Sequence, residues 1–341
     1  MIPYIKVPDI HINGPGFLKP TLHPFGVLVA TGVIIGTALA MKRAKDKGFD
    51  VDKLNSFITQ MLLMGFIGGH VLDSLFYHPD EVLRRPWSLV MLWEGLSSFG
   101  GFIGGLGGIV MWKYLEWKPI WRTPGIRIGK VHIVEPIVFY RPLRRPKALP
   151  ILPYVDLILS VFPVAWMFGR SGCSSVHDHP GAPAGVNDWL AVDFPSARPQ
   201  VTDGPGVHTS FGPLTFVHGH FPRYDLGLLE LMFTCILALS FALTWRRKLV
   251  TGAYVVAAAL AYGPMRFAMD FLRIHGDASA DGADPRYGGL TPAQWCCVVV
   301  TLYALYLYAF IRRQKLRGID PAEELRAPAP PAEPPPDAVA A

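Results

Sequence analysis

The stretch FGRSGCSSVHDHPG, residues 168–181, follows an apolar run at 151–168 and carries Arg170, His177 and His179. An apolar run of this kind is close to the length that crosses roughly 30 Å of hydrocarbon. Charged side chains at the edge of such a run are costly in lipid and are usually functional. The stretch therefore predicts a membrane helix that delivers an arginine and two histidines to a site.

The composition of the whole chain agrees with a membrane protein. Hydrophobic residues make up 51% of the 341 residues and charged residues 17%, whereas soluble domains carry about 25% charged residues. Seven apolar runs are long enough to span a bilayer, at 25–41, 54–77, 89–112, 151–168, 226–245, 249–272 and 290–311. We predict an all-α polytopic membrane protein with seven transmembrane helices.

The positions of lysine and arginine predict the orientation of these helices. Most of the 32 basic residues follow the first, third, fifth and seventh runs, as at 42–53 and 113–147. Basic flanks mark the cytoplasmic side of a membrane helix, so we expect the N-terminus outside and the C-terminus in the cytoplasm. The same distribution accounts for the net charge of +6, and no nucleic-acid partner is expected.

The apolar runs also divide the chain. Residues 1–24 are an outer N-terminal segment, and 25–311 form the transmembrane domain. Within that domain the outer loop 169–225 is expected to be a head or cap, because loops of this length rarely lack structure of their own. The tail 312–341 is rich in proline and alanine, which predicts a disordered cytoplasmic segment.

Polar residues recur at the outer depth of five predicted helices. They are His70, Asp73, Glu94, Arg170, Asp225, Glu230, Arg266, Asp270 and Arg273. The spacing of 266, 270 and 273 places those three residues on one helix face. Surplus guanidinium groups suit an anionic lipid headgroup, because arginine binds phosphate with two parallel hydrogen bonds. Alternatively, Arg170 and Arg273 extend to the interface, and Arg266 with Asp270 forms a structural ion pair.

Two short patterns have a structural and a functional interpretation. The glycine-rich stretch GGFIGGLGG at 100–108 favours close helix packing over a phosphate loop. The pairs His177/His179 and His218/His220 fit none of the usual zinc spacings. We therefore expect no metal and no cofactor, and we interpret Cys173 as a small packing residue.

Six motifs in sequence order resemble those of the bacterial prolipoprotein diacylglyceryl transferases. They are LHPFG (22–26), GGHVLDSLFY (68–77), WEGLSSFGGFIGG (93–105), FGRSGCSSVHDHPG (168–181), RYDLGLLE (223–230) and YGPMRFAMDFLR (262–273). The fourth resembles the family signature GRxGNFxNxExxG. The resemblance covers nearly all of 20–311, and it implies seven helices with the N-terminus outside.

The resemblance also implies a function. The family transfers the diacylglyceryl group of phosphatidylglycerol to the lipobox cysteine thiol of a preprolipoprotein, in the signal-peptide region, at the outer leaflet of the bacterial inner membrane. By position, Arg170 and Arg266 match essential arginines of the family and are expected to hold the phosphate. Residues expected to bind substrate are His70, Glu94, Asp178, Gly181, Glu230, Asp270 and Arg273.

This chain departs from the family motifs at several places. Phe25 stands where the family has a tyrosine, Gly100 where it has a histidine, Cys173 where it has an asparagine and His70 where it has an arginine. Two hypotheses follow. Either His177 or His179 has taken over as the catalytic base, with His70 as a further candidate, or the chain binds anionic phospholipid or envelope partners without transfer. A histidine accepts a proton near neutral pH.

Overall fold

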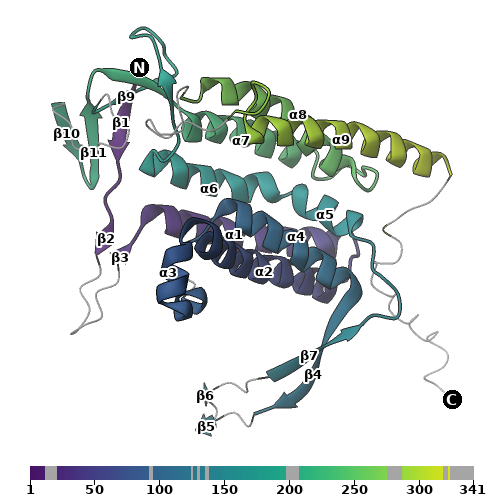
Figure 1. The fold of residues 1–341 in the computed structure, drawn as a ribbon. Coiled ribbons are helices and arrows are strands. Elements are labelled where there is room, and N and C mark those ends of the chain that lie inside the picture. Colours follow the sequence, from purple (N-terminus) through teal and green to yellow (C-terminus); the bar gives the residue numbers. More distant parts are fainter. Residues whose placement is uncertain are drawn as a thin grey trace, which may run out of the picture. The chain divides into compact units, whose positions relative to one another are not determined.

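A computed structural model describes residues 1–11, 21–91, 95–123, 126–128, 131–134, 138–196, 207–274, 286–317 and 322. Figure 1 shows the fold coloured along the sequence. The chain divides into two compact units. Unit 1 combines Met1–Lys42 with Val155–Asp320, and unit 2 combines Arg43–Tyr154 with Pro321–Ala341. Most of the expected site residues lie in unit 1, whereas His70 and Gly100 lie in unit 2.

Unit 1 is built on apolar helices. They are α1 (Pro24–Asp46), α5 (Leu152–Leu159), α6 (Phe162–Val176), α7 (Leu226–Leu243), α8 (Ala253–Met269), the short 3₁₀ helix η2 (Asp270–Leu272) and α9 (Pro292–Leu316). Buried Asp156 of α5 accepts hydrogen bonds from the backbone N–H groups of Tyr254 and Val255, at 2.7 and 3.1 Å. This carboxylate satisfies the otherwise unpaired N–H groups at the start of α8.

A six-stranded sheet accompanies these helices in unit 1. Its order is β10 (Val207–Phe211), β11 (Leu214–His218), β1 (Ile2–Lys6), β9 (Ala191–Phe194), β12 (Phe221–Asp225) and β8 (Pro180–Pro183). Only the β1–β9 pair, among the described strands, is parallel. A separate pair, β2 (Ile10–His11) and β3 (Thr21–Leu22), precedes α1. The N-terminal strand β1 and segment 169–225 thus share one sheet.

Unit 2 is centred on a helix pair, α2 (Val51–Tyr77) and α4 (Ser98–Tyr114). Between them lie α3 (Pro79–Arg84) and the 3₁₀ helix η1 (Pro86–Val90). A hairpin of β4 (Leu115–Arg122) and β7 (Val138–Arg144) follows, with a smaller pair, β5 (Ile126–Ile128) and β6 (Val131–Val134). Asp50 caps α2 by accepting from the backbone N–H groups of Asp52 and Lys53.

Glycines allow α2 and α4 to pack closely, as the sequence predicts for 100–108. A Cβ on Gly68 would lie 2.6 Å from Cα of Gly104, and a Cβ on Gly104 would collide with the Met64 carbonyl oxygen. Small residues at such crossings let helix backbones approach in a membrane. The expectation of close packing, rather than a phosphate loop, is confirmed.

Substitution of Gly104 tests this packing. Gly104→Val should destabilise the protein by about 1–3 kcal/mol, because the valine side chain forces α2 and α4 apart. Gly107→Ala, three residues along the same helix, is the matched control, since a Cβ there meets nothing within 4 Å. The measurement is the temperature at which each detergent-solubilised variant loses its monodisperse size-exclusion peak. Equal losses for both variants would contradict the packing.

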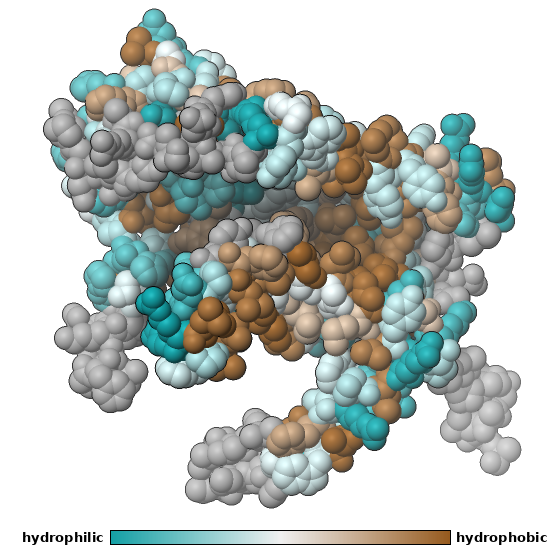
Figure 2. Space-filling model, viewed as in Figure 1, coloured by the Kyte–Doolittle hydropathy of each residue, from teal (hydrophilic) through white to brown (hydrophobic). Residues whose placement is uncertain are grey.

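The described helices include five that are long and apolar enough to cross a membrane. These are α1, α2, α7, α8 with η2, and α9; α5 and α6 add a sixth if the pair, bent by 55°, is one span. Large apolar side chains lie exposed along them, for example Leu239, Leu243 and Val299, and Figure 2 shows this apolar surface in brown. Extended exposed apolar surface of this kind is typical of contact with lipid. The mostly helical chain has the character of a polytopic membrane protein.

Two of the seven predicted spans differ from the helices observed. The run 89–112 begins in η1, and α4 starts only at Ser98, where Ser97 caps it by accepting from the N–H of Gly100. The helix is consequently 17 residues long. The run 151–168 breaks after Leu159, and α6 continues to Val176. Arg170 and Cys173 therefore lie within a helix, and not in the loop that follows it.

Helix α9 runs to Leu316, beyond the expected end at 311. The expected disordered tail lies, from residue 318 on, outside the described residues except for Ala322.

Candidate functional site

Three helices of unit 1 bring together a partly buried arginine, a buried glutamate and a tyrosine. Nη2 of Arg170 on α6 lies 2.9 Å from Oε1 of Glu230 on α7. The hydroxyl of Tyr262 on α8 donates to the same oxygen at 2.9 Å. Only 3% of the Glu230 side chain is exposed. A carboxylate this deeply buried needs such partners, because desolvation of an unpaired charge is costly.

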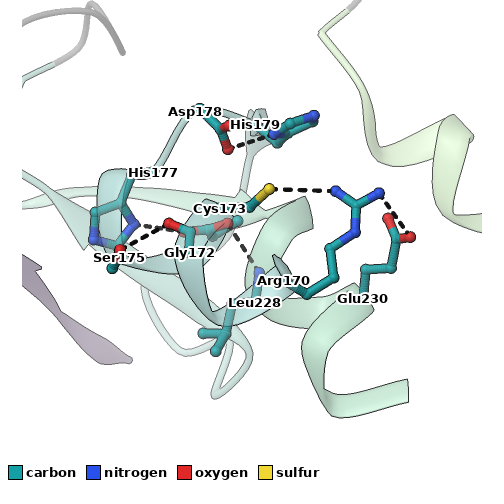
Figure 3. A network of polar contacts seen from close by, with 10 residues as sticks. Arg170, Gly172, Cys173, Ser175, His177, Asp178, His179, Leu228 and Glu230 are labelled. Carbon is teal, nitrogen blue, oxygen red and sulfur yellow. Dashed lines mark hydrogen bonds and ion pairs between the residues drawn. The ribbon is translucent and has the colours of Figure 1, made fainter. Parts of the chain in front are cut away.

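The guanidinium of Arg170 is only partly used by these contacts. Nη1 of Arg170 lies 3.6 Å from the Cys173 sulfur, one turn along α6, and Figure 3 shows the guanidinium between that sulfur and Glu230. Among the described residues, Nε of Arg170 is buried without a hydrogen-bond partner. An orphaned buried donor on a cation is unfavourable, and an anionic ligand would satisfy it.

A second charge cluster centres on Asp270. Oδ1 of Asp270 lies 3.1 Å from Nη2 of Arg266 and 2.7 Å from Nε of Arg273. The hydroxyl of Thr291 donates to Oδ2 of Asp270. Asp270 has no exposed surface, so its charge depends entirely on these partners. Tyr262, which donates to Glu230, lies one turn before Arg266 on α8, and this connects the two clusters.

His177 turns the chain at the end of α6. It adopts a left-handed backbone conformation with φ of 49°, which is uncommon for a residue other than glycine. Its Nδ1 lies 2.5 Å from Oδ2 of Asp225, its Nε2 lies 3.1 Å from the Ile5 carbonyl oxygen, and its ring stacks on Tyr4. Both ring nitrogens are thus engaged by the protein, and the contacts fix the turn.

The turn directs the next two residues back over α6. Nδ1 of His179 lies 2.5 Å from Oδ1 of Asp178, and Figure 3 shows this pair beside the Cys173 sulfur. Hydrogen bonds to the Asp178 carboxylate, first, and to the Cys173 thiol raise the pKa of His179 from 6.5 to about 9. At neutral pH the His179 imidazole already carries a second proton. It cannot accept another from a substrate in that state.

The side chains of Cys173, Asp178 and His179 are also a possible ligand set for a metal ion. One ligand atom from each lies within 4.8 Å of the other two. Cys173 is buried, whereas Asp178 and His179 have side chains exposed by 38% and 35%. The set combines sulfur, nitrogen and oxygen ligands.

The backbone of Gly181 pairs with that of Arg273. A Cβ at Gly181 would lie 2.7 Å from the Leu272 carbonyl oxygen and 2.9 Å from that of Tyr224. Only glycine permits this approach of strand β8 to η2. Gly181 thus places the segment after His179 next to the Asp270 cluster.

Unit 2 contains the other expected site residues. Nδ1 of His70 lies 3.0 Å from the Gly95 carbonyl oxygen and Nε2 lies 2.9 Å from that of Ser88; 1% of the residue is exposed. At Gly100, a Cβ would lie 2.5 Å from the Gly68 carbonyl oxygen, so the packing excludes a histidine side chain there. Glu94 lies outside the described residues.

Sequence reasoning overlooked Tyr262 and Thr291 as partners of the buried carboxylates. The spacing of 262, 266 and 270 repeats every four residues, so one helix face would have indicated Tyr262. No local pattern indicates Thr291, which caps α9 and reaches Asp270 only through the fold.

Comparison with known proteins gives a consistent result. The family model for prolipoprotein diacylglyceryl transferase matches residues 17–135 and 131–310. A phosphatidylglycerol–prolipoprotein diacylglyceryl transferase of Haemophilus influenzae is 33% identical over 102 residues, which is 29% of this chain and 38% of that relative. The matched stretch thus spans well under half the length of that relative.

Longer matches have lower identity. The corresponding transferase of Neisseria meningitidis is 24% identical over 82% of this chain and 88% of its own length. That of Salmonella newport is 23% identical over 91% and 97%. Because the family model matches most of the sequence, including all the residues of the two charge clusters, this chain belongs to the prolipoprotein diacylglyceryl transferase family.

Proposed function

We propose that the protein transfers the diacylglyceryl group of phosphatidylglycerol to the lipobox cysteine thiol of a preprolipoprotein. The observation that carries the proposal is the pair of linked charge clusters. Arg170, Arg266 and Arg273 face two buried carboxylates, Glu230 and Asp270. One positive charge is left over, together with the unsatisfied Nε of Arg170. A phosphodiester supplies one negative charge and oxygen acceptors for that donor.

The charge clusters would act on the leaving group. When the bond between the diacylglyceryl carbon and the phosphate oxygen breaks, negative charge develops on the departing glycerol phosphate. Donors already fixed in place stabilise such charge without reorganising. Arg170 and Arg266 would contact the phosphate, while Glu230, Asp270 and Arg273 would hold them in position. Neighbouring Asp178, Gly181 and His179 would form the side that receives the thiol.

The three candidate histidines lie in different surroundings. Both ring nitrogens of His177 are engaged by the protein. We therefore propose that His177 positions the turn and is not the base that deprotonates the thiol. His179 stands beside Cys173 and is the histidine nearer the Arg170 cluster. His70 is enclosed between two backbone carbonyls, and we propose a structural role for it in unit 2.

We further propose seven spans in the bacterial inner membrane, with the N-terminus outside, the C-terminus cytoplasmic and the site at the outer leaflet. Helix α4 would supply the seventh span in addition to the bent α5–α6 pair, because its length of 17 residues is at the lower end of the spanning range. The phospholipid headgroup and the signal-peptide region of the preprolipoprotein would both reach an outer site.

Reporter fusions test the orientation. Green fluorescent protein fused after residue 317 should fluoresce, and alkaline phosphatase at the same point should be inactive, because α9 would end in the cytoplasm. Insertion of the same reporters at the exposed Val186 should give the opposite pair of results. An active phosphatase after residue 317 would contradict the proposed orientation.

Complementation tests the function. Expression of this chain in cells depleted of their own transferase should restore growth and the lipid-modified form of a reporter lipoprotein. The close packing at Gly100 favours the alternative, a relative that binds anionic phospholipid or envelope partners without transfer, since it excludes a histidine from that position. Membrane-inserted protein that fails to restore modification, yet still binds vesicles containing phosphatidylglycerol, would establish the alternative.

A further inference from the structure

Cys173, Asp178 and His179 converge although no ordinary zinc spacing connects them in sequence. Cys173 lies in the last turns of α6, and the left-handed turn at His177 folds the next two residues back beside it. The turn is held from outside by Asp225, Ile5 and Tyr4. The convergence is therefore built into the sheet and helices of unit 1 and does not depend on the three side chains themselves.

We propose that these three side chains bind a divalent ion of the zinc class, with a fourth position open to the substrate thiol. The identity of this fourth ligand rests on the proposed function, whereas the metal site does not. Zinc sites with three protein ligands and one exchangeable position are the catalytic type. Sulfur, imidazole and carboxylate together suit zinc better than magnesium or calcium, which prefer oxygen ligands alone.

The geometry allows this coordination with small movements. Tetrahedral zinc with bonds of about 2.0–2.3 Å separates its ligand atoms by roughly 3.3–3.8 Å, and here they lie within 4.8 Å. The Asp178 and His179 side chains are each about one-third exposed, so they can rotate toward the buried sulfur. The ion would replace the hydrogen bond that now joins Asp178 and His179.

The surrounding charges also suit a divalent ion. One thiolate and one carboxylate neutralise its two positive charges, so a loaded site adds no net charge beside Arg170. The Arg170 N–H that points at Sγ of Cys173 would then donate to a metal-bound thiolate. Hydrogen bonds from outside the ligand set orient and tune such ligands.

The ion would activate the substrate thiol directly. A thiol that coordinates zinc is deprotonated, and a thiolate is the nucleophile. The substrate sulfur then forms a bond to the diacylglyceryl carbon that carries the phosphate. The bond from that carbon to the phosphate oxygen breaks. Glycerol phosphate leaves with the bonding electrons, and the thiol proton passes through solvent to the phosphate.

Metal content tests the site without reference to activity. Full-length protein purified in detergent through a tag without histidines, stripped with a chelator and re-equilibrated with zinc should retain about one zinc per chain, the content of a single zinc site. Cys173→Ser and His179→Gln should each lose most of it. Cys235→Ser, an exposed thiol on α7, and a His218→Ala/His220→Ala double variant are controls that should keep it. Wild-type protein without zinc, or equal content in Cys173→Ser, overturns the proposal.

Cobalt then reports on the open position. Cobalt-loaded protein should show a thiolate-to-metal charge-transfer band that Cys173→Ser lacks. A lipobox peptide should change the visible bands, and the same peptide with serine for cysteine should not; equal responses would overturn the substrate assignment. A zinc site without any thioether product would refute the proposed function alone. Full transfer by zinc-free protein would refute the role of the ion in activating the thiol and leave the proposed function intact.

Discussion

Arg170→Ala should reduce the rate of diacylglyceryl transfer by roughly 10²- to 10³-fold, the usual effect of removing one fixed donor to developing negative charge. The guanidinium of Arg170 contacts both Glu230 and the Cys173 sulfur. Its removal leaves Glu230 the hydrogen bond from the Tyr262 hydroxyl and removes the donor that would face the phosphate. The measurement is the rate of product formation from phosphatidylglycerol and a lipobox peptide.

Two further variants separate charge from geometry. Arg170→Lys keeps the charge but not the planar pair of donors, so it should recover only part of the activity. Arg246→Ala removes an exposed arginine that follows α7, and this variant should keep the wild-type rate of transfer. Folding is checked by the size-exclusion profile of each variant. An Arg170→Ala variant that folds and keeps more than a third of the activity would contradict the proposed role.

Asp270→Ala should destabilise the protein by about 3–5 kcal/mol, because it removes a fully buried carboxylate that two partly buried arginines share. Arg266 and Arg273 both bind Oδ1 of Asp270, and only 11% and 24% of their side chains are exposed. The Thr291 hydroxyl loses its acceptor as well. Unfolding in mixed detergent micelles, followed by circular dichroism, measures the free energy of unfolding.

The ion pair of Glu81 with Arg85 is the matched control. It has the same i, i+4 spacing as Arg266 with Asp270, but about half of each side chain is exposed. Exposed pairs contribute about 0–1 kcal/mol, so Glu81→Ala should cost little. Similar losses for Glu81→Ala and Asp270→Ala would show that burial of the Asp270 cluster has no energetic importance.

Hydropathy predicted the helices better than their ends. The runs at 226–245, 249–272 and 290–311 correspond to α7, α8 with η2, and α9, because long apolar segments have few alternatives in lipid. The bend between α5 and α6 escaped prediction. There Pro163 lies in the first turn of α6 and lacks the N–H that would continue the preceding helix. Mean hydropathy does not register this change.

The candidate site was only partly readable for a similar reason. Spacing along one helix indicates Arg266, Asp270 and Arg273, since i, i+4 and i+7 share a face. The contact of Arg170 with Glu230 joins residues on different helices, which no local pattern specifies. The meeting of Cys173 with His179 depends on a left-handed histidine at 177, and residues other than glycine seldom adopt that conformation.

Mass spectrometry of a lipobox peptide tests the account most directly. Purified protein in nanodiscs containing phosphatidylglycerol should add one diacylglyceryl group to the cysteine of the peptide, through a thioether that resists hydroxylamine, and should release glycerol phosphate in equal amount. Arg170→Ala should form little of this product, and Arg246→Ala as much as the wild type. Well-folded wild-type protein that leaves the peptide unmodified would contradict the proposed transferase activity.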